Sequence, residues 1–180
     1  MLLRDGRKDL ARHQLLHSQV DLQRLGELQV SAADEESAVE SQQTALRSYE
    51  HRLRELIEIC RSSGITPIFA TQPALYGDGI DEPTGVDLGR IKMGEHINGH
   101  LKWEILQMYN RATEEVAADS SCLRIVLGDR MPKSSRYFYD YHHFNNAGCA
   151  RVADIVAEEL TPYLKARALD LEQASGHDPR

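Results

Sequence analysis

The sequence brings a carboxylate and two imidazoles close together in the segment Asp140-Tyr141-His142-His143. Asp140 and His143 are three residues apart, so one turn of the chain can place the carboxylate against the imidazole. A carboxylate on one ring nitrogen fixes the histidine tautomer and stabilises the imidazolium. The other nitrogen can then serve as a general base toward a serine hydroxyl or water. A simpler interpretation, in which Asp140 only caps a turn and both histidines are partly exposed loop residues, is open at this point.

Alternating helices and short strands are predicted to position this segment. Apolar residues at helical spacing predict helices over 42–63, 101–118 and 149–165, and apolar runs predict strands over 65–71 and 123–127. This order is typical of an α/β protein with a parallel sheet, which carries its sites in loops after the carboxyl ends of strands. Two strands are nevertheless few, because a parallel sheet needs neighbouring strands and covered faces.

The chain divides into three predicted parts. Residues 1–41 are polar and predicted to be helical or disordered, residues 42–165 carry the α/β pattern, and residues 166–180 form a polar tail. The total of 180 residues suffices for one domain. The first 41 residues are expected to add little to the core.

Composition limits the classes of partner. The formal charge of -7 disfavours binding to a nucleic-acid backbone. No stretch of apolar residues is long enough for a membrane span. The residues after Met1 lack the apolar core of a secretory signal, so as written the chain is expected in the cytoplasm.

The motif Asp140-x-x-His143-Phe144, followed by a helix that starts near Gly148, resembles the last block of the SGNH (GDSL-type) hydrolases. Further pieces in matching order are 64–73, Tyr109-Asn110, 125–127 and 131–133, so the resemblance covers roughly 42–165. It implies a three-layer, flavodoxin-like parallel-sheet fold and hydrolysis of small acyl esters through an acyl-enzyme. His143 would be the general base, Asp140 would orient it, and no metal or organic cofactor would be needed.

The nucleophile that this resemblance requires is missing from the sequence. There is neither a Gly-Asp-Ser block nor a Gly-x-Ser-x-Gly elbow. Gly128-Asp129-Arg130 matches only the first two residues of Gly-Asp-Ser and has an arginine where the serine would be. The serines at 62, 63, 134 and 135 are predicted to lie on the surface, and the asparagines at 98, 110, 145 and 146 match no oxyanion motif. We hypothesise that the chain is the C-terminal portion of an SGNH hydrolase from a truncated or split reading frame. A lost N-terminus could have carried a signal peptide.

Two alternatives remain open. His96-x-x-x-His100 has the spacing that places two imidazoles on one helix face, and Asp140, His142 and His143 could add metal ligands. Alternatively, the chain is a catalytically inactive binding or assembly module that self-associates through the edge of its incomplete sheet.

Overall fold

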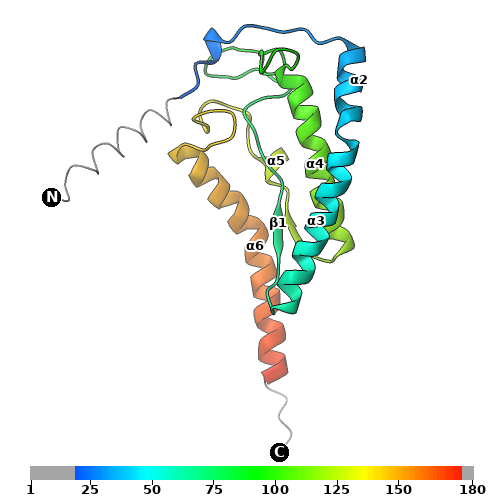
Figure 1. Ribbon diagram of the computed structural model, residues 1–180. Coiled ribbons are helices and arrows are strands. Elements are labelled where there is room, and N and C mark those ends of the chain that lie inside the picture. The colour runs from blue at the N-terminus through cyan, green and yellow to red at the C-terminus, as the bar shows by residue number, and fades with distance from the viewer. Residues whose placement is uncertain (1–18, 176–180) are drawn as a thin grey trace, which may run out of the picture.

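The computed structural model describes the backbone of residues 19–175, which form a mixed α/β arrangement (Figure 1). Its elements are the 3-10 helix η1 (Leu22–Arg24), α2 (Ala32–Ser41), α3 (Gln43–Ser62), β1 (Ile68–Ala70), α4 (Gly99–Asp119), β2 (Leu123–Ile125), α5 (Leu127–Arg130) and α6 (Asn146–Ser175). The order of the predicted helices and strands is confirmed. Predictions that fall on residues 1–18 and 176–180 lie outside the described residues.

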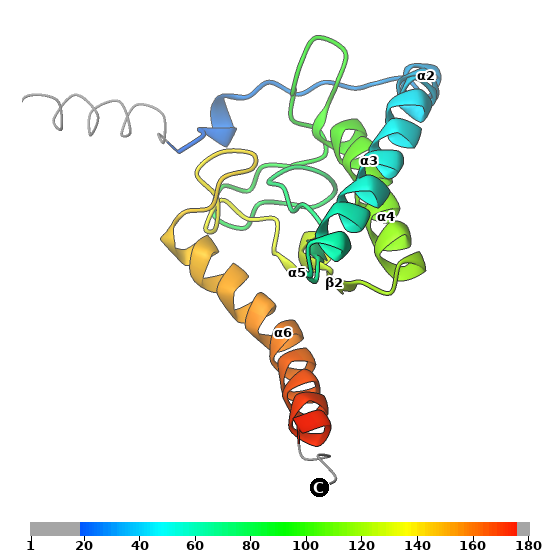
Figure 2. The same ribbon diagram turned by 60° about the horizontal axis from the view of Figure 1, so that its bottom comes forward.

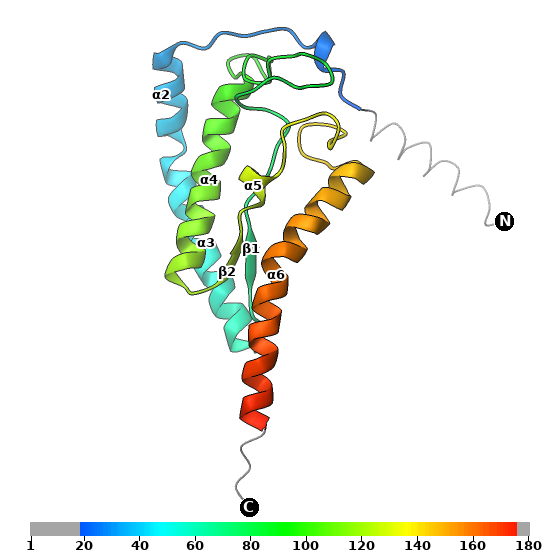
Figure 3. The same cartoon turned by 180° about the vertical axis from the view of Figure 1, so that it is seen from behind.

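The two strands pair in parallel, with Ile68 opposite Leu123 and Ala70 opposite Ile125. Helix α4 connects them, and α3 and α4 lie on one side of the strands while α6 lies on the other (Figures 1 and 3). Phe69 points into a small apolar cluster with residues of α3 and α4. Its neighbour Ile68 is 40% exposed, so one face of β1 is poorly covered.

The main core lies at the end of the sheet where the long loops gather. Its buried side chains come from both loops, α4, β2, α5 and α6: Ala74, Leu75, Tyr76, Leu88, Ile91, Trp103, Ile125, Leu127, Met131, Phe138 and Ile155. Leu22 belongs to the same cluster and is only 1% exposed. The N-terminal segment therefore contributes to the core, contrary to the expectation from its polar composition, because η1 turns one leucine inward.

Helix α6 is longer than predicted, since it begins at Asn146 and continues to Ser175, through ten residues that were assigned to a polar tail. Those ten residues are mostly strong helix formers, and no glycine interrupts them. Figure 2 shows the end of this helix extending away from the rest of the molecule. The run after Ser31 is likewise a helix, because the Ser31 hydroxyl accepts a hydrogen bond from the Asp34 backbone N–H at 3.2 Å.

The long loop predicted between β1 and α4 is present and is fixed by a buried carboxylate. Asp81 has no exposed surface and accepts hydrogen bonds from the backbone N–H of Ser135 at 2.7 Å and from its hydroxyl at 2.9 Å. The Thr84 hydroxyl donates a further bond at 2.5 Å. Asp81 thus joins this loop to the one that carries Asp140.

Among the described residues, no helix combines the length and the apolar character that crossing a bilayer requires.

Candidate active site

Asp140 and His143 face each other in the loop between α5 and α6. The Oδ2 atom of Asp140 lies 2.8 Å from Nδ1 of His143, and Oδ1 lies 3.1 Å from the same nitrogen. Oδ1 also accepts the backbone N–H groups of His142 and His143, each at 2.9 Å. One tight turn therefore fixes the carboxylate and the imidazole together, as the spacing predicted. Asp140 therefore makes both kinds of contact, because it caps the turn and also bonds the His143 ring.

Loop pairing holds this turn in place. The backbone N–H of Tyr139 donates to the carbonyl of His143 at 2.8 Å, and Phe138 forms an isolated antiparallel bridge with Phe144. Phe138 is fully buried, and its ring packs on that of Phe144 with centroids 5.1 Å apart. The apolar pair anchors both ends of the segment in the core and leaves Asp140 and His143 at its outer end.

The start of α6 fits closely against the same loop. Asn145 caps the helix, because its side-chain oxygen accepts the backbone N–H of Gly148 at 3.0 Å. A Cβ atom at position 148 would lie 2.0 Å from the carbonyl oxygen of Tyr137. Only glycine permits this approach, so Gly148 sets the distance between α6 and the loop that carries Asp140.

The charge of Asp140 is stabilised by its hydrogen bonds. Partial burial acts to raise the pKa of this carboxyl, but the backbone N–H groups of His142 and His143 and the His143 ring outweigh it and lower the pKa to about 2. Asp140 is therefore ionised at neutral pH and has no proton to give, so Nδ1 of His143 is the donor. That tautomer leaves Nε2 with the lone pair that a general base requires. The His143 side chain is 68% exposed and accessible to a substrate.

His142 has a different environment from its neighbour. Its ring meets the ring of Tyr76 edge-on, with centroids 5.4 Å apart. Burial lowers the pKa of His142, and the nearby charge of Lys102 adds to the effect. Tyr76 is itself buried, which raises the pKa of its hydroxyl to about 12. His142 is thus a neutral packing residue at neutral pH, and His143 is the better candidate for proton transfer.

The structure contains a second aspartate–histidine pair, which the sequence did not predict. Nδ1 of His100, at the start of α4, lies 2.7 Å from Oδ1 of Asp78. The hydrogen bond from Asp78 raises the pKa of His100, although some burial opposes it. The two residues are 22 positions apart, and no local pattern joins them. Only the path of the long loop brings them together.

The alternative metal site at His96 and His100 does not form a helical pair. His96 precedes α4, is highly exposed and lies 3.8 Å from a carboxylate oxygen of Glu95, whereas His100 turns to Asp78. Among the side chains that the structure describes, those of residues 19–168, no group of three or more His, Cys, Asp or Glu is arranged to hold a metal ion.

The serines considered as nucleophiles divide into two classes. Ser62 and Ser63 are exposed, as predicted. Ser134 and Ser135 were predicted on the surface but are only 9% and 4% exposed, because the Asp81 carboxylate draws this segment inward. The Ser135 hydroxyl donates to Asp81 and serves to connect the two loops. None of these four serines is assigned as the nucleophile.

Two of the asparagines that matched no oxyanion motif, Asn98 and Asn110, have structural hydrogen bonds. Asn98 caps α4 by accepting the backbone N–H of Leu101 at 2.8 Å. The amide of Asn110 bonds both the backbone N–H and the carbonyl of Gln72, at 2.8 and 3.0 Å, and so fixes the chain where it leaves β1. These contacts position the loops around the site.

The partial match Gly128-Asp129-Arg130 belongs to α5. Its arginine forms ion pairs with Glu158 and Glu159 of α6, and this contact explains the residue without a catalytic role.

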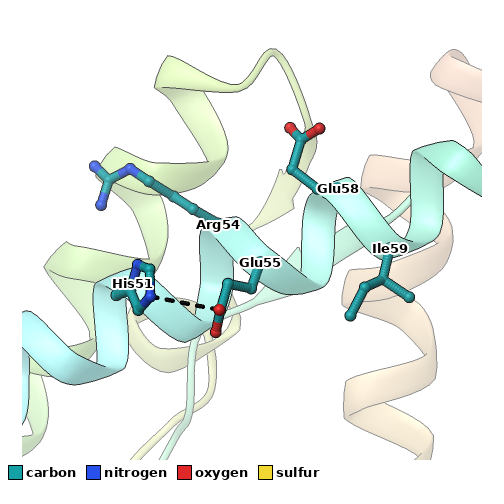
Figure 4. Close-up of a pocket in the computed structure, with 5 residues that line it drawn as sticks. All are labelled: His51, Arg54, Glu55, Glu58 and Ile59. Carbon is teal, nitrogen blue, oxygen red and sulfur yellow. Dashed lines mark ion pairs between the residues drawn. The ribbon is translucent and has the colours of Figure 1, made fainter.

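Two surface hollows lie away from Asp140 and His143. One follows the outer face of α3, where Arg54, Glu58 and Ile59 line it together with the His51–Glu55 ion pair (Figure 4). The other lies between the N-terminal segment and Ser135. Neither is lined by the Asp140–His143 pair, which sits on the open surface of its loop.

The Asp140–His143 turn is the feature on which the resemblance to the SGNH hydrolases rests. Its geometry is that of an imidazole oriented by a carboxylate, which suits proton transfer to and from an oxygen nucleophile. No protein-family model matches the chain, and no curated protein or solved structure matches it significantly.

Proposed function

We propose that the chain supplies the acid–base residues of an ester hydrolase of the SGNH (GDSL) type, with His143 as general base and Asp140 as the carboxylate that orients it. The observation that carries the proposal is the 2.8 Å contact between Asp140 Oδ2 and His143 Nδ1. It is supported by the position of the pair, in a loop downstream of a parallel strand, where α/β proteins commonly place their sites.

The chemistry follows from the lone pair on Nε2 of His143. This nitrogen takes the proton of a hydroxyl nucleophile while the oxygen forms a bond to the acyl carbon. The imidazolium then gives the proton to the leaving alcohol as the old ester bond breaks. Attack by water through the same base releases the acid. The scheme uses a small acyl ester as substrate and requires neither a metal nor an organic cofactor.

The proposal extends to the fold. Helices on both sides of a parallel pair of strands are consistent with a three-layer, flavodoxin-like arrangement (Figure 3). Among the described residues β1 and β2 pair only with each other, so further strands would join the sheet at one of its two free edges. The serine nucleophile of this family is expected on such a strand.

The test is hydrolysis of 4-nitrophenyl acetate by the full chain, in which His143 activates water directly because no serine among the described residues is assigned as the nucleophile. His143→Ala should reduce the rate by about 10²-fold or more, which is the usual contribution of a general base. His100→Ala is the matched control, because that histidine is also held by an aspartate but on another loop, and its rate should stay within about twofold of the wild type. Equal loss in both variants, or a wild-type chain that does not hydrolyse the ester, contradicts the proposal.

A second candidate is an assembly module, which the exposed apolar residues near β1 favour. Ile59 of α3, Ile65 and Ile68 are 63%, 58% and 40% exposed. An unpaired strand edge beside such residues favours association with another chain. Sedimentation equilibrium over a hundredfold concentration range tests this idea, with Ile68→Lys expected to shift the protein toward monomer. A monomeric wild type at all concentrations rules out self-association.

A further inference from the structure

Two lysines place their ammonium groups over aromatic rings. Nζ of Lys102 lies 5.5 Å from the centroid of Tyr76, and Nζ of Lys133 lies 3.8 Å from that of Trp103. Both lysines are partly buried. Removing an ammonium group from water costs free energy that a cation–π contact partly offsets, and a nearby negative charge offsets it further.

The surroundings of the two lysines differ. The negative charges of Asp78 and Asp129 act on Lys133 and oppose the lowering of its pKa by burial. Lys102 has no such neighbours along its helix: the residues three and four positions away are Asn98, Gly99, Ile105 and Leu106. Among residues 19–168, whose side chains the structure describes, no carboxylate forms an ion pair with Lys102.

Lys102 lies near His142, the residue that precedes His143. Tyr76 connects them, because its ring contacts both the Lys102 ammonium and the His142 imidazole, and His142 precedes His143 in the chain. The charge of Lys102 reaches His142 strongly enough to affect its titration. Asp140 also acts on that ring, but its oxygens are already bonded to His143 and to two backbone N–H groups.

We propose that Lys102 binds the negative group of an anionic ester and so places its acyl carbon beside His143. The reaction in this statement rests on the proposed hydrolase function, whereas the binding step does not. The overall charge of -7 repels anions from most of the surface, so an unpaired ammonium at this position gives the site its selectivity. The negative group that Lys102 would bind is a carboxylate or a phosphate attached to the ester.

Binding is tested with succinate as a non-reactive anionic probe and succinamide as its neutral analogue. Chemical shifts of the His142 and His143 imidazoles report on occupancy of the site. Lys102→Met removes the charge and retains the chain length, Lys102→Arg restores the charge, and Lys92→Met is the matched control at an exposed lysine. Thermal unfolding of each variant verifies that it folds.

Succinate should bind more tightly than succinamide, and Lys102→Met should weaken succinate about tenfold, the loss expected for one charge-assisted contact. Lys102→Arg and Lys92→Met should keep most of the affinity. No binding of succinate, equal binding of both probes, or equal losses at positions 102 and 92 overturns the inference.

Two esters separate this inference from the proposed reaction. Selective binding of succinate without hydrolysis of any ester keeps the anion site and contradicts the hydrolase. Hydrolysis of 4-nitrophenyl acetate and of 4-nitrophenyl hemisuccinate at equal rates, both unchanged in Lys102→Met, keeps the hydrolase and overturns the anion site.

Discussion

Among the residues that the structure describes, two aspartate–histidine pairs of nearly equal length differ in how they are built. In one, Asp140 and His143 belong to a single turn, and two backbone N–H groups fix the carboxylate. In the other, Asp78 and His100 come from a loop and a helix, and the Asp78 side chain is 71% exposed. The distances are 2.8 and 2.7 Å, so distance alone does not separate the two pairs.

The difference lies in what holds each carboxylate. Asp140 is fixed by backbone donors even without the histidine, so its orientation does not depend on the ion pair, and the pKa of its carboxyl falls to about 2. Asp78 contacts the solvent over most of its side chain, where an ion pair contributes little because water and salt screen it. An imidazole that performs chemistry needs the first kind of support, because a mobile carboxylate does not fix the ring.

The largest predicted effect is on the rate of ester hydrolysis, which should depend on Asp140 and not on Asp78. Asp140→Asn removes the charge that selects the Nδ1–H tautomer of His143, so ester hydrolysis should fall by about 10²-fold or more. Asp78→Asn should change the rate by less than about twofold, because His100 is not the base. Nitrogen chemical shifts of the His143 ring measure the tautomer directly and should change only in Asp140→Asn. A rate that falls equally in both variants would remove the distinction between the pairs.

The next largest effect concerns Gly148, where the start of α6 packs against the loop that carries Asp140. Gly148→Ala places a Cβ atom 2.0 Å from the Tyr137 carbonyl oxygen, so α6 and the loop must separate. Urea unfolding should show a loss of about 2 kcal/mol or more. Gly26→Ala is the matched control, because nothing lies within 4 Å of the added carbon, and its stability should change by less than about 0.5 kcal/mol. A tolerated Gly148→Ala would show that the spacing of α6 and the loop is adjustable.

The local part of this site could be predicted from the sequence, and the tertiary part could not. Asp140 and His143 are close in the chain, so their spacing alone implied the contact. The Asp78–His100 pair and the position of Lys102 over Tyr76 depend on the path of a loop of nearly thirty residues that carries no periodic pattern.

The fold shows the same division. The helices α3 and α4 have apolar residues at helical spacing and the strands are short apolar runs, so the sequence predicted all four elements. Two misjudged positions, Leu22 and Ser135, are explained by tertiary contacts: a single leucine turned into the core, and a buried aspartate that draws a serine inward. Composition does not reveal either contact. The end of α6 differs from the predicted polar tail for another reason, because residues 166–175 are polar on average but have high helix propensity.

The smallest predicted effect is opposite pH dependence of stability for the two pairs. The pKa of Asp140 is lowered from its ordinary value of 3.8 to about 2, so its stabilisation is present above about pH 4 and is lost as the pH falls toward 2. The pKa of His100 is raised above its ordinary 6.5, mainly by its hydrogen bond to Asp78. That stabilisation is present below about pH 6.5 and is lost as the pH rises through the raised pKa.

Urea unfolding of two variants tests these opposite signs. The deficit of Asp140→Asn should be about 1 kcal/mol near neutral pH, discounted for exposure, and should shrink in acid. The deficit of His100→Gln should be a few tenths of a kcal/mol below about pH 6.5 and should vanish once the pH is well above the raised pKa. Each variant serves as the control for the other, since only a change that follows its own titration has the expected sign. Deficits that change in parallel with pH would mean that global charge, and not these two pairs, sets the acid and alkaline limits of stability.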